Sequence, residues 1–182
     1  MNYMTISPCD IANGVGVRTV LWVSGCSLHC PGCHNSESHD RCAGKLFDDG
    51  AKKELFDALS KPYIRGLTLS GGHPLEDYNL EDLYLLLIDV KKNFPDKDIW
   101  LYTGLTLQYT DFSTLSRGIA PCDVIHNYRY SILNLCDVVI DGPFIQEQRD
   151  ITLPFRGSKN QRLIDVKETI KQNKIVLYTI QN

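Results

Sequence analysis

Short apolar runs alternate with helical patterns along this chain. The runs Val17–Val23, Leu67–Ser70, Ile99–Tyr102 and Val138–Ile140 are rich in β-branched and other apolar residues, which is typical of strands buried in a sheet. Strands that alternate with helices indicate an α/β fold with a mostly parallel sheet. The pattern therefore predicts four strands, of which Val17–Val23 is the first.

Two segments between these strands have apolar residues at helical spacing. Asp48 or Asp49 can cap a helix that runs to about Ser60. Asn79 is placed to cap a second helix, which Pro95 stops. Two further segments are harder to interpret. The stretch 106–134 gives no distinct pattern, and the run 175–178 could add an edge strand.

Glycine follows three of the four predicted strands, at Gly71, Gly104 and Gly142. In parallel α/β sheets and barrels, ligands bind at this carboxyl edge of the strands. A chain of 182 residues is too short for the usual eight-stranded barrel of about 250 residues. We therefore expect a single domain, 1–182, with an incomplete parallel (β/α) barrel. Its open side suits a substrate that arrives as a loop of another protein.

Composition and charge narrow the class of function. Hydrophobic residues make up 43% of the chain and charged residues 23%, as in an ordinary compact enzyme. The net charge of -3 gives no reason to expect binding to nucleic acid. No apolar run is long enough to cross a bilayer, and the N-terminus lacks the pattern of a signal peptide. We expect a cytoplasmic enzyme that contacts no membrane.

Three cysteines, Cys26, Cys30 and Cys33, fall within eight residues. A [4Fe-4S] cluster held by three thiolates keeps one iron open for a small molecule. Zinc is the alternative, because it prefers four closed ligands and three histidines are near enough to complete a Cys3His site: His29, His34 and His39. Without a signal peptide, disulfides are not expected. We interpret the remaining cysteines as small buried apolar residues: Cys9, Cys42, Cys122 and Cys136.

The cysteine spacing, Gly25 before it and the segment Ser70–Pro74 together resemble the radical S-adenosylmethionine (SAM) enzymes. Within that superfamily, the chain resembles the activating component of the anaerobic (class III) ribonucleotide reductase from residue 2 to about 165, leaving 166–182 as an extra tail. No one segment is specific by itself, but seven of them occur in family order: Asp10–Arg18, Val23–Cys26, Cys30–Asn35, Leu67–Gly72, Lys97–Gly104, Asp137–Gly142 and Arg156–Gln161.

The resemblance implies a radical chemistry carried by cofactors. Cys26, Cys30 and Cys33 would hold three irons of a [4Fe-4S] cluster, and SAM would chelate the fourth. An electron from a flavodoxin-like donor would cleave SAM, and the resulting 5′-deoxyadenosyl radical would take a hydrogen from one glycine of the large, glycyl-radical subunit of the reductase. The resemblance thus implies an oxidoreductase that installs a glycyl radical on its partner.

The same resemblance assigns the SAM contacts. Gly71 and Gly72 would let the backbone approach the methionine part of SAM. Gly32 and His34 flank the third thiolate, where the loop approaches the adenine. His73 stands where the family usually has Asp or Glu, and a neutral histidine can accept a hydrogen bond through only one ring nitrogen. We expect this change to alter the strength or pH dependence of SAM binding and not the reaction class.

Four further residues belong to the family-like segments without a defined role. Tyr102 and Thr103 could line the nucleoside pocket or simply pack. Arg156 could pair with a carboxylate of SAM or of the reductase tail, or be a solvated surface residue. Arg18 has no assigned task. Two other functions stay open: activation of a different glycyl-radical enzyme, and a non-catalytic interaction module stabilised by zinc.

Overall fold

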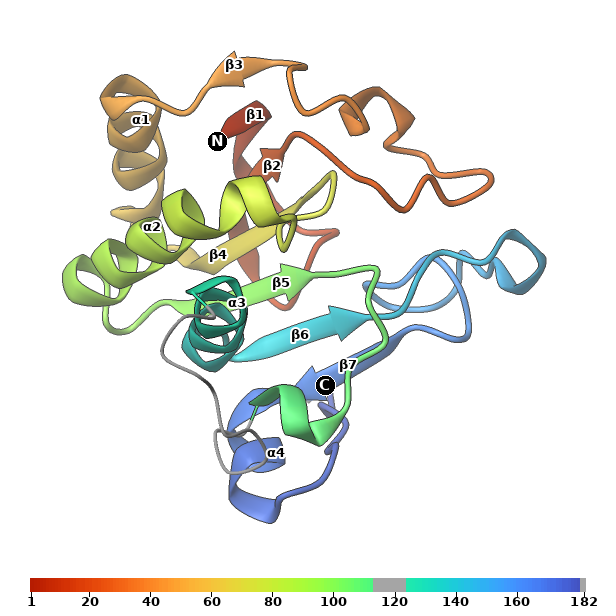
Figure 1. Cartoon of the computed structure of the whole chain (residues 1–182). Helices are drawn as coiled ribbons and strands as arrows, with labels where there is room; N and C mark the ends of the chain where they lie inside the picture. Colours follow the sequence, from red (N-terminus) through yellow and green to blue (C-terminus); the bar gives the residue numbers. More distant parts are fainter. Residues whose placement is uncertain (113–123, 181–182) are drawn as a thin grey trace.

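A single seven-stranded sheet forms the centre of the molecule (Figure 1). The computed structural model describes residues 1–112 and 124–180. The spatial order of the strands is β3-β1-β2-β4-β5-β6-β7. Their bounds are β1 Asn2–Asp10, β2 Val17–Val23, β3 Lys45–Leu46, β4 Ile64–Gly71, β5 Asp98–Tyr102, β6 Val138–Asp141 and β7 Arg162–Asp165.

The middle and the edges of the sheet differ in strand direction. The neighbouring pairs β2/β4, β4/β5 and β5/β6 are parallel. The pairs that involve β1, β3 or β7 are antiparallel. The predicted α/β class is confirmed, as a mixed sheet whose parallel centre is flanked by antiparallel strands.

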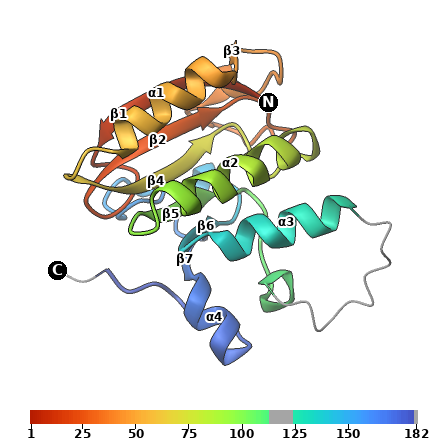
Figure 2. The same cartoon turned by 90° about the vertical axis from the view of Figure 1, so that its left-hand side faces the viewer.

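Helices lie along one face of the sheet (Figure 2). They are α1 Asp49–Leu59, α2 Leu80–Asn93, α3 Val124–Leu135 and α4 Val166–Gln172. Alternate strand residues, among them Leu67, Leu69, Ile99, Leu101 and Val139, join the main apolar core beneath these helices. The residues between them point to the opposite face, where Trp100, Val138, Ile140 and Leu163 form a smaller cluster.

The strongest sequence patterns agree with the structure. β2 has the predicted bounds, and the other predicted strands fall within β4, β5 and β6. Asp48 caps α1 by accepting a hydrogen bond from the Ala51 backbone N–H. Asn79 is the N-cap residue of α2, as predicted, but its side chain makes no capping hydrogen bond. That side chain is buried and donates to the Ser24 carbonyl oxygen at 3.2 Å instead.

β1 is the largest omission of the sequence analysis, because it makes Val17–Val23 the second strand of the chain and not the first. The expected edge strand at 175–178 is not formed as a full strand. The tail runs beside β7 with one isolated bridge, Ile164 to Leu177, and with Tyr178 N–H donating to the Leu163 carbonyl at 2.8 Å. Across the described residues, no helix has the length and apolar character to span a membrane.

Candidate functional site

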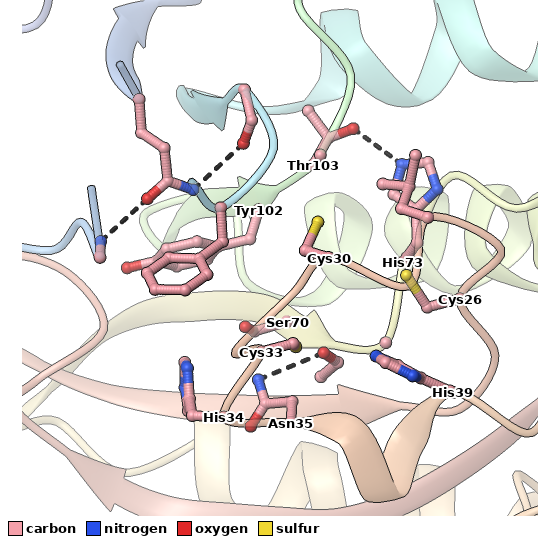
Figure 3. Close-up of a pocket in the computed structure, with 18 of the residues that line it drawn as sticks. Cys26, Cys30, Cys33, His34, Asn35, His39, Ser70, His73, Tyr102 and Thr103 are labelled. Carbon is pink, nitrogen blue, oxygen red and sulfur yellow. Dashed lines mark hydrogen bonds between the residues drawn. The ribbon is translucent and has the colours of Figure 1, made fainter. Parts of the chain in front are cut away.

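A pocket opens where the parallel strands end (Figure 3). Its wall contains the glycines that follow β4, β5 and β6, at positions 71, 104 and 142. The predicted meeting of these three turns at one edge is therefore observed. Cys26, Cys30 and Cys33 line the same pocket, and we refer to it as the thiol pocket.

Backbone hydrogen bonds hold the cysteine loop, which directly follows β2. Gly25 N–H donates to the Ser38 carbonyl at 2.7 Å, and Cys26 N–H donates to the His39 carbonyl at 3.0 Å. Cys33 N–H closes a turn onto the Cys30 carbonyl at 3.1 Å. These bonds make the loop double back, so that all three thiols reach one pocket.

The donor set fits an iron–sulfur cluster. The three thiols are partly buried, and burial raises the pKa of the Cys26 thiol above its ordinary value. A thiol of this kind becomes a thiolate when a metal binds it. Among residues 1–112 and 124–180, no group of three His, Cys, Asp or Glu side chains has the arrangement of a site for a single metal ion. Three thiols that line one pocket are the donor set that a [4Fe-4S] cluster with one open iron requires.

The histidines proposed for zinc are placed differently from one another. His29 and His39 contact each other, with their Nδ1 atoms 3.0 Å apart. His39 and His34 line the thiol pocket, whereas His29 does not. The His39 Nε2 atom is buried without a hydrogen-bond partner. His39 is thus a pocket residue with a free polar atom, and the sequence analysis proposed it only as a possible zinc ligand.

The double glycine packs against the cysteine loop. A Cβ atom at Gly72 would come within 2.4 Å of the Gly25 carbonyl oxygen, and Gly71 has φ +103°, which favours glycine. Gly72 N–H donates to the Val23 carbonyl at 2.8 Å, and the Asn35 side-chain amide donates to the Gly71 carbonyl at 3.2 Å (Figure 3). Close approach of two backbones therefore already requires glycine here, before any ligand is considered.

His73 is buried at the inner end of the pocket. Its Nε2 atom is 2.8 Å from Thr103 Oγ1 (Figure 3), and its Nδ1 atom is 3.3 Å from Glu76 Oε1. Burial lowers the pKa of His73 below its ordinary value, although Glu76 opposes this effect. Both ring nitrogens thus have partners inside the protein, and neither is a spare acceptor.

The contacts of Arg18, which had no assigned role, indicate that it is a structural residue. Its side chain is fully buried, with Nη2 2.6 Å from Asp98 Oδ1 and Nε donating to Thr68 Oγ1 at 2.7 Å. The guanidinium also lies over the Trp100 ring, 5.1 Å from its centroid. Thr68 in turn donates to the carbonyl of Asn13, a residue of the thiol pocket. Arg18 therefore supports the floor of the pocket from behind.

The segment Arg156–Gln161 clamps the end of β6. The Gln161 side chain accepts from Gly157 N–H at 2.9 Å and donates to the Gly142 carbonyl at 3.1 Å. Beside this clamp is a second cavity, lined by nine residues: Gly32, His34, Phe144, Gln146, Arg149, Asp150, Ile151, Arg156 and Gly157. Because it shares His34, Phe144 and Gly157 with the thiol pocket, the two spaces adjoin.

The predicted site residues are brought together in the thiol pocket, except for Gly32 and Arg156. The thiol pocket is lined by Cys26, Cys30, Cys33, His34, Gly71, Gly72, His73, Tyr102 and Thr103. Gly32 lies in the second cavity, where a Cβ atom would be 2.2 Å from Gln146 Oε1. Arg156 lies there too. The roles of these residues toward a cofactor remain predictions.

The remaining cysteines differ in burial. Cys136 is buried in the main core, as expected, but Cys9 and Cys42 are exposed, so their interpretation as buried residues was wrong. Cys122 lies outside the described residues. Glu76 was missed altogether. No motif marks it, because its contacts depend on the turn between His73 and α2.

The thiol-lined pocket and the α/β sheet define a class of iron–sulfur protein, and comparison with known sequences agrees. Residues 12–164 match the family model described as a 4Fe-4S single cluster domain. The chain belongs to this family, and more narrowly to the family of anaerobic ribonucleoside-triphosphate reductase-activating proteins. It is 42% identical to the protein of that name from Haemophilus influenzae, over 88% of this chain and 96% of the relative.

Two further relatives carry the same name. The protein from Enterobacteria phage T4 is 42% identical over 90% of this chain and 93% of its own length. The protein from Escherichia coli strain K12 is 34% identical over 88% of this chain and 96% of its own length. The similarity therefore extends over nearly the whole length of each relative, and it includes a bacteriophage protein as well as bacterial ones.

Proposed function

We propose that this protein is a radical SAM activase that generates a glycyl radical on an anaerobic ribonucleotide reductase. The observation that carries the proposal is the convergence of Cys26, Cys30 and Cys33 on one pocket at the carboxyl edge of the parallel strands. The names of the relatives, which refer to activation of the anaerobic reductase, support the choice of partner.

The three thiolates would hold a [4Fe-4S] cluster and leave one iron for SAM. When bound, these two groups would supply the redox chemistry, namely one-electron reductive cleavage of SAM, with a flavodoxin-like donor as the reductant, and removal of a hydrogen atom from a glycine Cα; the products would be methionine, 5′-deoxyadenosine and a glycyl radical. The protein contributes ligation, orientation and exclusion of water.

The chain's own residues have distinct tasks in this proposal. Gly71 and Gly72 form the edge of the pocket on which the methionine part of SAM would lie, because without a Cβ atom they would let that part of SAM approach the backbone. His34 offers a flat ring beside the third thiolate for the adenine. Tyr102 and Thr103 close the wall that follows β5.

The sheet form supports the arrival of a protein substrate. The α-helices of the described residues lie along one face of the sheet (Figure 2), and the parallel centre with antiparallel edges is compatible with a partial barrel that stays open at one side. The second cavity adjoins the thiol pocket at the three residues that the two spaces share, His34, Phe144 and Gly157. It contains Arg149 and Arg156, and Arg156 Nε is buried without a hydrogen-bond partner. Two guanidinium groups suit a carboxylate carried by the reductase.

The test is an anaerobic reaction of reconstituted protein, SAM, a reductant and the cognate reductase. Electron paramagnetic resonance should detect a glycyl doublet on the reductase, and chromatography should detect an equivalent amount of 5′-deoxyadenosine. Cys30→Ala is the matched control and should give neither product. If SAM is cleaved and no doublet forms on that reductase, the assigned partner is wrong and another glycyl-radical enzyme becomes the candidate. A colourless zinc protein without SAM cleavage would overturn the reaction class.

A further inference from the structure

A chain of hydrogen bonds joins three separate segments around the thiol pocket. It runs from Thr103 at the end of β5, through His73 after β4, to Glu76 and then to Ser27 in the cysteine loop. The distances are 2.8 Å from Thr103 Oγ1 to His73 Nε2 and 3.3 Å from His73 Nδ1 to Glu76 Oε1. The same Glu76 oxygen accepts from Ser27 N–H at 2.7 Å and from Ser27 Oγ at 2.6 Å.

The partners determine where each proton lies. Burial acts to raise the pKa of Glu76, but the hydrogen bonds from Ser27 outweigh it and the pKa is lowered, so the carboxylate is ionised and can only accept. His73 Nδ1 must therefore carry the ring proton. Thr103 Oγ1 accepts from Leu105 N–H at 3.2 Å, which leaves its own hydroxyl hydrogen for His73 Nε2. Every link then has one donor and one acceptor.

The location of these hydrogen bonds, next to the cysteine loop and the double glycine, indicates a role in shaping the thiol pocket. Ser27 is adjacent to the cluster ligand Cys26, and His73 is adjacent to Gly72. His73 N–H also donates to the Gly25 carbonyl at 2.7 Å, so backbone and side chain both connect this turn to the cysteine loop. His73 is 3% exposed, and the Glu76 side chain is 12% exposed. Partners of this kind, behind metal ligands, fix the geometry of a site.

We propose that His73 and Glu76 form one positioning pair, which sets the distance between the cysteine loop and the strand ends that would hold SAM. The inference rests on the proposed function, because the pocket shaped by the pair is the one assigned to the cluster and SAM. It differs from a direct contact between His73 and the SAM amine, since both ring nitrogens are used within the protein.

A pair defined by its hydrogen bonds should tolerate exchange of its two members. In the double variant His73→Glu/Glu76→His, the carboxylate at position 73 can accept from Thr103 Oγ1, and the imidazole at position 76 can donate to that carboxylate and accept from Ser27 N–H. Thr103 Oγ1 and Ser27 N–H keep their acceptors, and the exposed Ser27 hydroxyl can donate to water instead. Each single variant instead places two carboxylates or two imidazoles side by side, and like charges or unmatched donors result.

The experiment is an exchange cycle on the reconstituted protein. Calorimetry under anaerobic conditions would measure SAM affinity, and the change in the spectrum of the reduced cluster on adding SAM would be followed by electron paramagnetic resonance. We expect each single variant to bind SAM roughly 10-fold to 100-fold more weakly. The double variant should return to within about threefold of the wild type, because the coupling between contacting residues is restored.

Two results would overturn the pair. Single variants that bind SAM like the wild type would show that the residues do not shape the pocket. A double variant as weak as the sum of the single effects would show that they act independently. Glu54→Gln, on the exposed side of α1, is the matched control for removing a carboxylate. It should change neither the SAM affinity nor the spectral change of the reduced cluster on adding SAM.

A measurement on the unaltered chain covers the case in which variants do not fold. Nitrogen-15 spectra of histidine-labelled, cluster-free, reduced protein would report the His73 tautomer, for which we expect the proton on Nδ1. A proton on Nε2 would contradict the pair. The outcomes also separate this inference from the proposed function: a wild type that neither binds nor cleaves SAM speaks against the function, whereas the tautomer tests the pair in either case.

Discussion

The two faces of the central sheet are built from neighbouring residues but have opposite characters. On the face beneath the helices, Leu67, Leu69 and their neighbours form a continuous apolar core. On the other face, Thr68 and Ser70 are just as inaccessible to solvent, yet they contact Arg18 and the thiol pocket. Burial alone therefore does not separate structure from function in this molecule. The second face itself contains both kinds of residue, because polar side chains line the thiol pocket and Trp100, Val138, Ile140 and Leu163 form the smaller apolar cluster.

The difference has an energetic meaning. The helix-covered face gains stability from apolar area removed from water, with no directional requirement. The pocket face buries polar groups, and each of them costs free energy unless it has a partner. Arg18, His73 and Thr68 all have such partners, so this face is a network in which geometry is specified. We expect substitutions on the first face to change stability, and substitutions of the pocket residues on the second face to change the cofactor site.

The largest predicted effect concerns cysteines from the two regions. Cys30→Ala should abolish the cluster absorbance and SAM cleavage, because a [4Fe-4S] cluster then has two protein ligands, and the same holds for Cys26 and Cys33. Cys136→Ala, in the helix-covered core, should keep both signals and lower the free energy of unfolding by about 1 kcal/mol. Iron content and urea unfolding measure the two effects.

The exposed cysteines are the controls for this comparison. Cys9→Ala and Cys42→Ala should leave cluster content and stability unchanged, because neither side chain is in the thiol pocket. For Cys122→Ala the sequence predicts that the cluster signal and SAM cleavage are retained. Full activity in Cys30→Ala would mean that the three thiols do not hold the cluster together.

Two adjacent residues of β4, Leu69 and Ser70, lie on opposite faces of the sheet and test the comparison within one strand. Leu69→Ala should lower the free energy of unfolding by about 2 to 5 kcal/mol, as expected for a fully buried leucine. Ser70→Ala should cost about 1 kcal/mol or less and weaken SAM binding by about tenfold, the value of one hydrogen bond. Urea unfolding and calorimetry on both variants would reveal whether the two effects separate. Equal losses of stability would show that both faces act only as core.

Sequence patterns revealed the first face far better than the second. Apolar spacing identified β2, β4, β5, β6 and α1, because these elements depend on a repeated local signal. It did not identify β1, which contains Pro8 and has shifts of register at two points, so that pairing with β2 and not local preference makes it a strand. Tertiary context decides such a segment.

The site divides in the same way. The three cysteines and the double glycine were readable, because closely spaced ligands and a turn leave a local signature. The link between His73 and Glu76 was not, because it depends on where a turn directs two side chains and on Thr103, thirty residues further along the chain. Likewise, the structural role of Gln161 depends on the distant Gly142.

A smaller effect is expected where the two cavities meet. Arg156→Gln should raise the KM for the reductase by about tenfold, the cost of a charge-assisted hydrogen bond, and leave SAM cleavage in the absence of the reductase unchanged. The reason is that Arg156 lines the second cavity and not the thiol pocket. Lys92→Gln, on the exposed side of α2, is the matched loss of charge and should have no effect. A higher KM for SAM instead would assign the arginine to the SAM carboxylate.

The smallest effect is a pH dependence that originates in His73. Burial lowers the pKa of His73 in the folded chain below the ordinary value of 6.5. At a pH between the folded-state pKa and 6.5, the unfolded chain therefore binds a proton at this histidine that the folded chain does not. Stability should therefore fall as the pH drops below about 6.5 and be largest above it. In reduced, cluster-free protein, urea unfolding at pH 7.5 and at pH 5.5 would measure this difference. His73→Gln keeps a donor toward Glu76 and an acceptor toward Thr103 but cannot titrate, so its stability should change less between the two pH values. If the variant loses as much stability as the wild type, protonation of other groups causes the pH dependence and His73 is no more sensitive to pH than an exposed histidine.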